Sequence, residues 1–267
     1  MSIHPTAIID KQAQIGEGVR IGPYSIIEGD TAIGEGCEIG PHVIVHSYTS
    51  LGERCRVHSG AVLGDLPQDI GFKGAESYVR IGSDCVIREG VTIHRGTAPG
   101  TSTEVGDGCF LMAFSHLGHN VRMGRNVIMA NGALCGGYVE VGDQVFISGN
   151  VVVHQFCRIG RLAMLSGNSG ISKDLPPYCV TVGCSRNTVG SLNVVGMRRG
   201  GLPPDARKIV KSAFQILYRS GLNADQAIAV IKEKLPNEPA SEFVEFIEGS
   251  KRGICGGHVR EGEQDSG

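Results

Sequence analysis

The chain lacks several features that mark common functional classes. Its 267 residues contain no tryptophan and only 5% aromatic residues, the net charge is −2, and its nine cysteines include no CxxC pair. This near-neutral charge gives no basic field for nucleic acid, and no apolar run reaches the roughly 18 residues of a transmembrane segment. The N-terminus has no signal-peptide pattern. We therefore expect a cytoplasmic protein without a transmembrane segment, a nucleic-acid partner or zinc-site cysteine spacing.

An aliphatic residue recurs every six positions without losing phase. Steps of six from Ile9 to Ile171 visit 28 positions, of which 24 are Ile, Val, Leu or Met. A small or β-branched residue such as Ala13, Val19 or Ser25 follows four positions later, which suits a narrow interior made of strands. Half of the 24 precede a glycine, which we expect to relieve an unusual φ. This hexapeptide repeat predicts a parallel β-helix, in which neighbouring coils bury one another.

The repeat is interrupted twice. Asp69 and Ala75 replace two of the aliphatic residues, and Pro99 replaces a third. We expect loops inserted near 64–78 and 95–104. Insertions on a solenoid are often its binding elements, so both loops are candidate parts of a functional site.

After the repeat the pattern changes to that of α-helices. Asn223 and Ser241 are candidate N-caps, and Gly221 and Pro236 are candidate helix ends. The predicted helices span about 206–220, 223–235 and 241–248. The predicted fold is mainly β, with a β-helix at 1–190, a C-terminal α-helical domain at 191–252 and a Gly-rich disordered tail at 253–267.

Five cysteines occupy the small inward position of the repeat, namely Cys37, Cys55, Cys85, Cys109 and Cys157. A buried cysteine behaves as a small hydrophobic residue. We therefore interpret these cysteines as packing residues and not as a redox or metal-binding set.

Stacking of the coils brings several polar residues together. If three hexads make one coil, residues 18 apart are neighbours at roughly 4.8 Å. The predicted columns are His119, Gly137 and Gln155; Asn120 and Tyr138; and Gly118, Gly136 and His154. A neutral imidazole can act as a general base, and a glycine N–H can stabilise an oxyanion. The pattern indicates acyl transfer by direct attack of the acceptor, without a nucleophilic Ser or Cys.

A metal site is the alternative interpretation of the histidines. Some β-helix enzymes bind zinc with three histidines at a subunit interface. The pair His116 and His119 has a different spacing, and no Asp, Glu or Cys lies beside it. We therefore expect no metal.

Motifs along nearly the whole chain resemble, in the same order, those of the UDP-N-acetylglucosamine acyltransferase family. They are TIHRGT at 92–97, His116 with His119, VHQFC at 153–157, PPY at 176–178, Asn193 with RRG at 198–200, and YRSG at 218–221. The resemblance implies a left-handed β-helix, an exception to the usual right-handed crossover. It also implies a homotrimer with active sites between subunits, and the first step of lipid A synthesis.

The resemblance implies a role for individual residues. His119 is the general base that takes a proton from the 3-hydroxyl of the sugar, which then attacks a 3-hydroxyacyl thioester on acyl carrier protein. Gly137 stabilises the oxyanion, and Gly167 matches the position that limits acyl length and leaves room for a longer chain. The substrate-binding residues are Gln68, Asp69, His116, Tyr138, His154, Gln155, Asn193 and Arg199. No cofactor is implied, since phosphopantetheine arrives on the carrier protein.

Four positions depart from the family pattern. Asn120 stands where the family has Asp, Tyr138 where it has His, Gly71 where it has Lys, and Val195 where it has Glu. An amide can orient the catalytic imidazole but brings no charge, so we expect a weaker base. Three interpretations remain open: acylation of the hydroxyl with help from Tyr138, N-acylation of a 3-amino UDP-sugar, or a non-catalytic paralogue that binds a nucleotide sugar.

Overall fold

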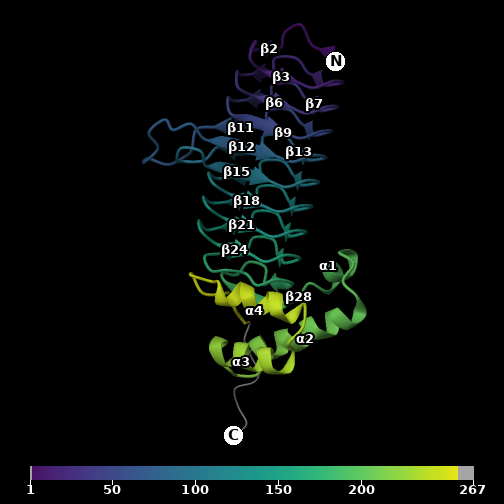
Figure 1. The fold of residues 1–267 in the computed structure, drawn as a ribbon, viewed down its shortest axis with the longest axis vertical. Helices are drawn as coiled ribbons and strands as arrows, with labels where there is room; N and C mark the ends of the chain where they lie inside the picture. The colour runs from purple at the N-terminus through teal and green to yellow at the C-terminus, as the bar shows by residue number, and fades with distance from the viewer. Residues whose placement is uncertain (1, 258–267) are drawn as a thin grey trace.

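The hexapeptide repeat folds into strands of mostly two residues separated by turns. In β4 (Arg20–Ile21) and β5 (Ile26–Ile27), for example, the second residue is buried and the first is exposed. The computed structural model describes residues 2–257, and it places these strands on the three sides of a long prism (Figure 1). The prism is a parallel β-helix, as the repeat predicts, and it is left-handed, as the family resemblance implies.

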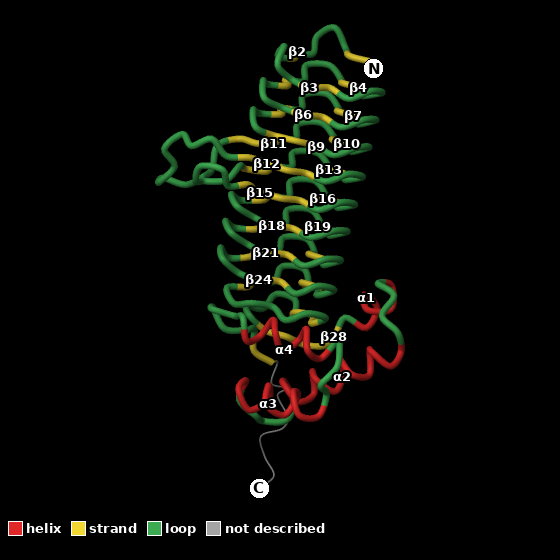
Figure 2. Tube along the Cα trace, viewed as in Figure 1, coloured by secondary structure: helices red, strands yellow, loops and turns green. Residues whose placement is uncertain are grey.

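The strands of successive coils form three sheets (Figure 2). Sheet A contains β1 (Ser2–Ile3), β4, β7 (Glu38–Ile39), β10 (Arg56–Val57), β13 (Val86–Ile87), β16 (Phe110–Leu111), β19 (Ile128–Met129), β22 (Phe146–Ile147), β25 (Met164–Leu165), β27 (Cys179–Thr181), β28 (Thr188–Leu192) and β29 (Gly256–Gly257). Sheet B contains β2 (Ile8–Ile9), β5, β8 (Ile44–Val45), β11 (Val62–Asp65), β14 (Thr92–His94), β17 (His116–Leu117), β20 (Leu134–Cys135), β23 (Val152–Val153) and β26 (Gly170–Ile171). Sheet C contains β3 (Gln14–Ile15), β6 (Ala32–Ile33), β9 (Thr49–Leu51), β12 (Tyr78–Ile81), β15 (Ser102–Val105), β18 (Arg122–Met123), β21 (Glu140–Val141) and β24 (Arg158–Ile159).

The register confirms three hexads to a coil. His116 pairs with Leu134, and Leu134 pairs with Val152, each 18 residues further along. The two predicted loops lie between β11 and β12 and between β14 and β15, where they project from the prism (Figure 1). The stack continues across them because the chain returns to the next coil in register.

Except for Gly64, whose φ is 87°, the glycines that follow the aliphatic residues have a different role from the one we expected. Positive φ occurs three positions after the aliphatic residue, at Gly18 and at non-glycine residues such as Asn120. At Gly16, directly after an aliphatic residue, an added Cβ would lie 2.8 Å from the backbone carbon of Gly34 in the next coil. These glycines allow close contact between stacked coils.

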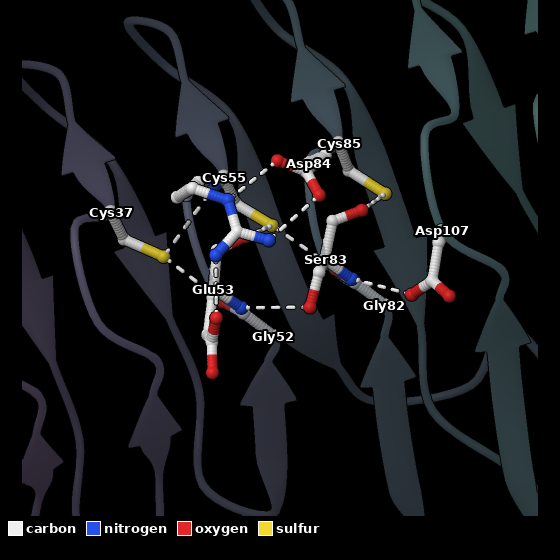
Figure 3. A network of polar contacts seen from close by, with 10 residues as sticks. Cys37, Gly52, Glu53, Cys55, Gly82, Ser83, Asp84, Cys85 and Asp107 are labelled. Carbon is white, nitrogen blue, oxygen red and sulfur yellow. Dashed lines mark hydrogen bonds and ion pairs between the residues drawn. The ribbon is translucent and has the colours of Figure 1, made fainter.

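The inward cysteines pack within the prism, as predicted (Figure 3). The thiols of Cys37 and Cys55 donate to the carbonyl oxygens of Gly52 and Gly82, each at 3.1 Å. Burial raises the pKa of the Cys135 thiol to about 12. These sulfurs satisfy the backbone of the adjacent coil while they fill the core.

Four helices follow the prism, at one end of it (Figure 2). They are α1 (Val194–Arg199), α2 (Pro204–Arg219), α3 (Ala224–Lys234) and α4 (Ala240–Glu248). Asn223 caps α3 with a capping box, as predicted, but the N-cap of α4 is Pro239 and not Ser241. The short helix α1 was not predicted. Arg161 in the last coils binds Glu242 of α4 at 2.7 Å, which ties the helices to the prism.

The predicted tail is structured in its first part. Cys255 is fully buried, and β29 pairs with β28, so residues 253–257 belong to the fold. The remainder of that predicted tail, 258–267, lies outside the described residues. Across residues 2–257, no helix combines the length and apolarity needed to cross a membrane.

The burial of the cysteines predicts how the native protein reacts with a thiol reagent. Cys184 is exposed, whereas the other eight cysteines are buried. We expect one fast-reacting thiol per chain in the native protein and nine after denaturation, measured by thiol titration. The variant Cys184→Ser should remove the fast phase, and a second fast thiol in that variant would contradict this packing.

Candidate active site

A hollow of ≈ 340 Å³ lies on sheet B and at its corner with sheet C. Six of the predicted site residues line it, namely Gln68, His116, His119, Gly137, His154 and Gln155. Five of them lie in or just after β17, β20 and β23, which stack in register. Gln68 comes from the first inserted loop. The structure therefore brings together the column of His119, Gly137 and Gln155 that the spacing predicted.

The imidazole of His119 lies directly against Gly137. A Cβ at Gly137 would be 2.6 Å from Nε2 of His119, so only glycine leaves room for the ring. The N–H of Tyr138 donates to the carbonyl of His119 at 2.9 Å, and the N–H of Phe156 donates to the carbonyl of Gly137 at 3.0 Å. No acceptor within residues 2–257 bonds to the N–H of Gly137. This donor is available for a ligand beside the imidazole.

Asn120 and Tyr138 hold the other side of the imidazole. Nδ1 of His119 lies 3.1 Å from Oδ1 of Asn120, whose side chain is buried. The ring of Tyr138 packs edge to face on His119 at 5.2 Å and stacks on Phe156 at 5.0 Å. Asn120 and Tyr138 therefore occupy stacked positions, as predicted, and their side chains are linked through His119 and one further residue.

That further residue is Thr97, which sequence analysis did not assign to the site. Its backbone N–H donates to Oδ1 of Asn120 at 3.1 Å, and its Oγ1 lies 3.0 Å from the same oxygen. Oγ1 is also 2.8 Å from the hydroxyl of Tyr138. Thr97 belongs to the second inserted loop, where counting by sixes cannot place a residue. The TIHRGT motif was the one signal that pointed to it.

His116 lines the hollow with an uncharged ring. Its Nδ1 is 2.7 Å from Oγ1 of Thr92, and its ring packs edge to face on His94 at 5.1 Å. Burial, together with the nearby His94 and His119, lowers the pKa of His116 to about 4, and burial also lowers the pKa of His94. Both rings are uncharged at neutral pH. Within the described part of the chain, no three His, Cys, Asp or Glu side chains are grouped to hold a metal ion.

His154 and Gln155 form the far end of the hollow. Nδ1 of His154 lies 3.1 Å from the carbonyl oxygen of Gln155 and 3.4 Å from Nη2 of Arg252. Arg252 also donates to the carbonyl oxygen of Ser172 at 3.0 Å. The C-terminal segment thus adds a cation beside His154, and this residue, Arg252, was not among the predicted site residues.

Six predicted site residues do not line this hollow: Asn120 and Tyr138 contact His119 from outside it, and the other four lie further away. Asp69 accepts from the N–H of Gly71 at 2.8 Å within its own loop, where the family has lysine at position 71. Asn193 caps α1 and donates to the carbonyl of Leu162, in the turn between sheets C and A, and Arg199 ends the same helix. Gly167 lies in the turn between sheets A and B. Within one chain, these last three residues occupy other corners of the prism.

The lowered pKa of His116 predicts a loss of stability in mild acid. The unfolded chain takes up a proton near the ordinary pKa of 6.5, whereas the folded protein resists it until about 4. The contribution of neutral His116 to the free energy of unfolding is therefore complete above pH 6.5 and is lost as the pH falls toward 4. The wild type should lose unfolding free energy as the pH falls from 7 to 5. In His116→Gln this loss should be about 1–2 kcal/mol smaller, measured in denaturant at fixed protein concentration. The control His42→Gln, at an exposed histidine, should retain the wild-type loss.

Two family descriptions match the sequence. "Bacterial transferase hexapeptide (six repeats)" matches residues 12–47, 30–65 and 102–137, all within the prism. "Udp N-acetylglucosamine O-acyltransferase; Domain 2" matches residues 174–255, which include all four helices. The two matches correspond to the two structural parts of the chain.

Relatives are similar over almost the whole chain. A protein of Burkholderia orbicola (strain MC0-3), named acyl-[acyl-carrier-protein]–UDP-N-acetylglucosamine O-acyltransferase, is 46% identical over 94% of this chain and 98% of its own length. A protein of the same name from Anaeromyxobacter sp. (strain Fw109-5) is 44% identical over 95% and 99%. The structure of Francisella novicida UDP-N-acetylglucosamine acyltransferase matches with a TM-score of 0.92 and 35% identity, over 97% of this chain and 95% of that one. The sequence motifs, the prism and these similarities together show that the chain belongs to the UDP-N-acetylglucosamine acyltransferase family.

Proposed function

We propose that this chain transfers a 3-hydroxyacyl group from acyl carrier protein to the 3-hydroxyl of UDP-N-acetylglucosamine, with His119 as the general base. The observation that carries the proposal is the position of the His119 imidazole against Gly137, whose N–H has no partner within residues 2–257. A base and an oxyanion donor thus lie side by side in one hollow. The names of the relatives supply the two substrates, and the family resemblance implies the pathway, the start of lipid A synthesis.

The proposed reaction needs no covalent enzyme intermediate. Nε2 of His119 takes the proton from the sugar hydroxyl as its oxygen attacks the thioester carbonyl. The N–H of Gly137 stabilises the negative charge that develops on the carbonyl oxygen. The carbon–sulfur bond then breaks, and the imidazolium returns its proton to the departing phosphopantetheine thiolate. This chemistry calls for no resident metal or organic cofactor.

A homotrimer is part of the proposal because two faces of the prism are apolar. Ile8, Leu134 and Val152 are exposed on sheet B, at 64%, 39% and 52% of their surface. The outward residues of sheet A in its C-terminal half are also apolar: Val86, Phe110, Ile128, Phe146 and Met164. Sheet C instead carries the charged ladder Arg80, Glu104, Arg122, Glu140 and Arg158. Exposed apolar residues grouped on one face of a protein mark a surface that binds another protein.

Three-fold packing on these faces would also complete the site. With sheet C toward solvent, sheet B of one subunit meets sheet A of the next, and the corner between A and B lies at the axis. His119, at the corner between B and C, then faces the neighbour's corner between C and A, where Asn193 and Arg199 lie. Gly167, at the corner between A and B, lies at the deep end of the same cleft. The arrangement suits a nucleotide at the rim and an acyl chain directed inward.

The nine free cysteines support the cytoplasmic location that the sequence predicts, because structural thiols remain reduced there. The same location supplies acyl carrier protein, which delivers the acyl group.

The amide at position 120 favours one alternative acceptor. An amino group at the 3-position of the sugar attacks a thioester with less help from a base, and Asn120 provides orientation without charge. The experiment that decides is turnover with both acceptors side by side, using carrier proteins with 3-hydroxyacyl chains of several lengths. Ester product supports the proposal, and amide product alone supports the alternative. Binding of UDP-sugar without either product would instead indicate a non-catalytic paralogue.

Replacement of His119 tests its role directly. We expect His119→Ala to lower kcat by at least about 100-fold, the usual contribution of a general base, without altering the trimer on size-exclusion chromatography. The matched control His58→Ala removes another surface histidine and should keep wild-type kcat. Full activity of His119→Ala would refute the assignment.

Mixed trimers test whether two subunits share one site. Co-expression of His119→Ala chains with Arg199→Ala chains should restore transfer that neither variant shows alone. Random assembly gives about a quarter of the clefts an intact His119 from one subunit and an intact Arg199 from the next. We therefore expect about a quarter of wild-type kcat. Mixed trimers no more active than the separate variants would contradict a site shared in this way.

A further inference from the structure

We propose that Thr97 is a positioning residue that determines which nitrogen of His119 carries the proton, by fixing the side-chain amide of Asn120. The inference rests on the proposed role of His119 as the base. It concerns a residue of the second inserted loop, and it explains how the site functions with an amide at position 120.

An amide next to a catalytic imidazole creates an ambiguity that a carboxylate does not. The two oxygens of a carboxylate are equivalent acceptors, so either orientation keeps the proton on Nδ1 of the imidazole. An amide has one acceptor and one donor end. With Oδ1 of Asn120 toward His119, Nδ1 carries the proton and Nε2 keeps the lone pair that a base requires. With the amide reversed, its NH₂ group would donate to Nδ1 and move the imidazole proton to Nε2, which abolishes the base.

Thr97 removes this ambiguity with a donor that cannot change. Its backbone N–H lies 3.1 Å from Oδ1 of Asn120, and a backbone N–H only donates. Reversal of the amide would place NH₂ against this N–H, two donors facing each other at a side chain that is 8% exposed. Buried polar groups left without a partner are strongly disfavoured. The N–H and the Oγ1 hydroxyl, which donates to the same oxygen at 3.0 Å, together keep the amide oxygen where Nδ1 of His119 can donate to it.

The hydroxyl of Tyr138 adds a hydrogen bond that points toward the same amide oxygen. This hydroxyl lies 2.8 Å from Oγ1 of Thr97, which in turn lies 3.0 Å from Oδ1 of Asn120. Tyr138 donates to Thr97, Thr97 donates to Asn120, and His119 donates to the same oxygen from the other side. Stacking on Phe156 holds the tyrosine ring in place. The tyrosine and the asparagine thus form one coupled unit with Thr97 at its centre.

The contact is itself held by both insertions. Oγ of Ser77, at the end of the first inserted loop, donates to the carbonyl of Gly96 at 2.6 Å, next to Thr97. Oγ1 of Thr103 accepts from the N–H of Asn120 at 2.8 Å and donates to the carbonyl of His94 at 2.6 Å. These bonds fix the backbones on both sides of the amide, so the distance between Thr97 and Asn120 does not depend on side-chain packing alone.

The test compares Thr97→Val and Thr97→Ser in two backgrounds. Valine keeps the backbone N–H and the shape but removes Oγ1, so part of the control over the amide is lost. In the wild-type background we expect kcat to fall about tenfold with an unchanged KM for the acceptor, and serine to restore it. In the Asn120→Asp background the same valine substitution should change kcat by less than about twofold. Ser102→Ala, which removes a hydroxyl from the start of β15 outside this unit, should have no effect.

The position of the proton provides a second readout that does not require turnover. Nitrogen NMR of protein labelled with ¹⁵N-histidine, assigned with His119→Ala, distinguishes protonated Nδ1 from protonated Nε2. We expect Nδ1–H in the wild type and a mixture of both forms in Thr97→Val. If valine prevents folding, Tyr138→Phe, which removes only the donor to Thr97, should shift the proton in the same direction.

An unchanged proton position in both variants, or an equal loss of kcat in both backgrounds, would overturn the inference. Failure of the proposed function has a different signature. In that case His119→Ala would keep full activity, while Thr97→Val would still shift the proton of His119 in the spectra.

Discussion

Backbone contact between stacked coils is the constraint on which the rest of this structure depends. Each strand bonds only to the coils before and after it, so a residue's position is determined by its place in the six-residue repeat. Glycine after the aliphatic residue is needed because an added Cβ would meet the next coil's backbone, as at Gly16. The same stacking places His119 against Gly137. The active-site contact is therefore a special case of the contact that builds the fold.

This constraint also explains which parts of the site the sequence could predict. Between Val105 and Ile171 the repeat is unbroken, and counting by 18 correctly stacked Gly137 and Gln155 on His119. The two insertions change the separation of paired residues to 30 between Val62 and Thr92 and to 24 between Thr92 and His116. The six-residue repeat cannot place a residue inside such a loop, so Thr97 was not predicted. Arg252 was missed because it reaches His154 from beyond the helices.

The three sides of the prism differ in the residues that they present outward. Sheet C is charged outward, whereas sheets A and B are apolar outward over the coils that carry the site. A residue assigned by family resemblance can therefore lie far from His119 in its own chain and still be part of the site. Asn193 and Gly167 lie at the two other corners of the prism. In the proposed trimer, symmetry brings these positions into a common cleft, and the repeat of a single chain does not specify that symmetry.

The proposed chemistry at His119 depends on the orientation of the imidazole and not on a negative charge beside it. The rings of His116 and His94 are neutral, since burial lowers the pKa of each, and Asn120 adds no carboxylate. In the proposed mechanism, the imidazolium formed during transfer therefore has one principal counter-charge, the oxyanion held by Gly137, which exists only in the transition state. Such a site stabilises the transition state more than the resting enzyme, which is the condition for catalysis. The proposed mechanism requires that the imidazole always presents Nε2, and the bonds of Thr97 to Asn120 and Tyr138 are the contacts that we propose meet this requirement.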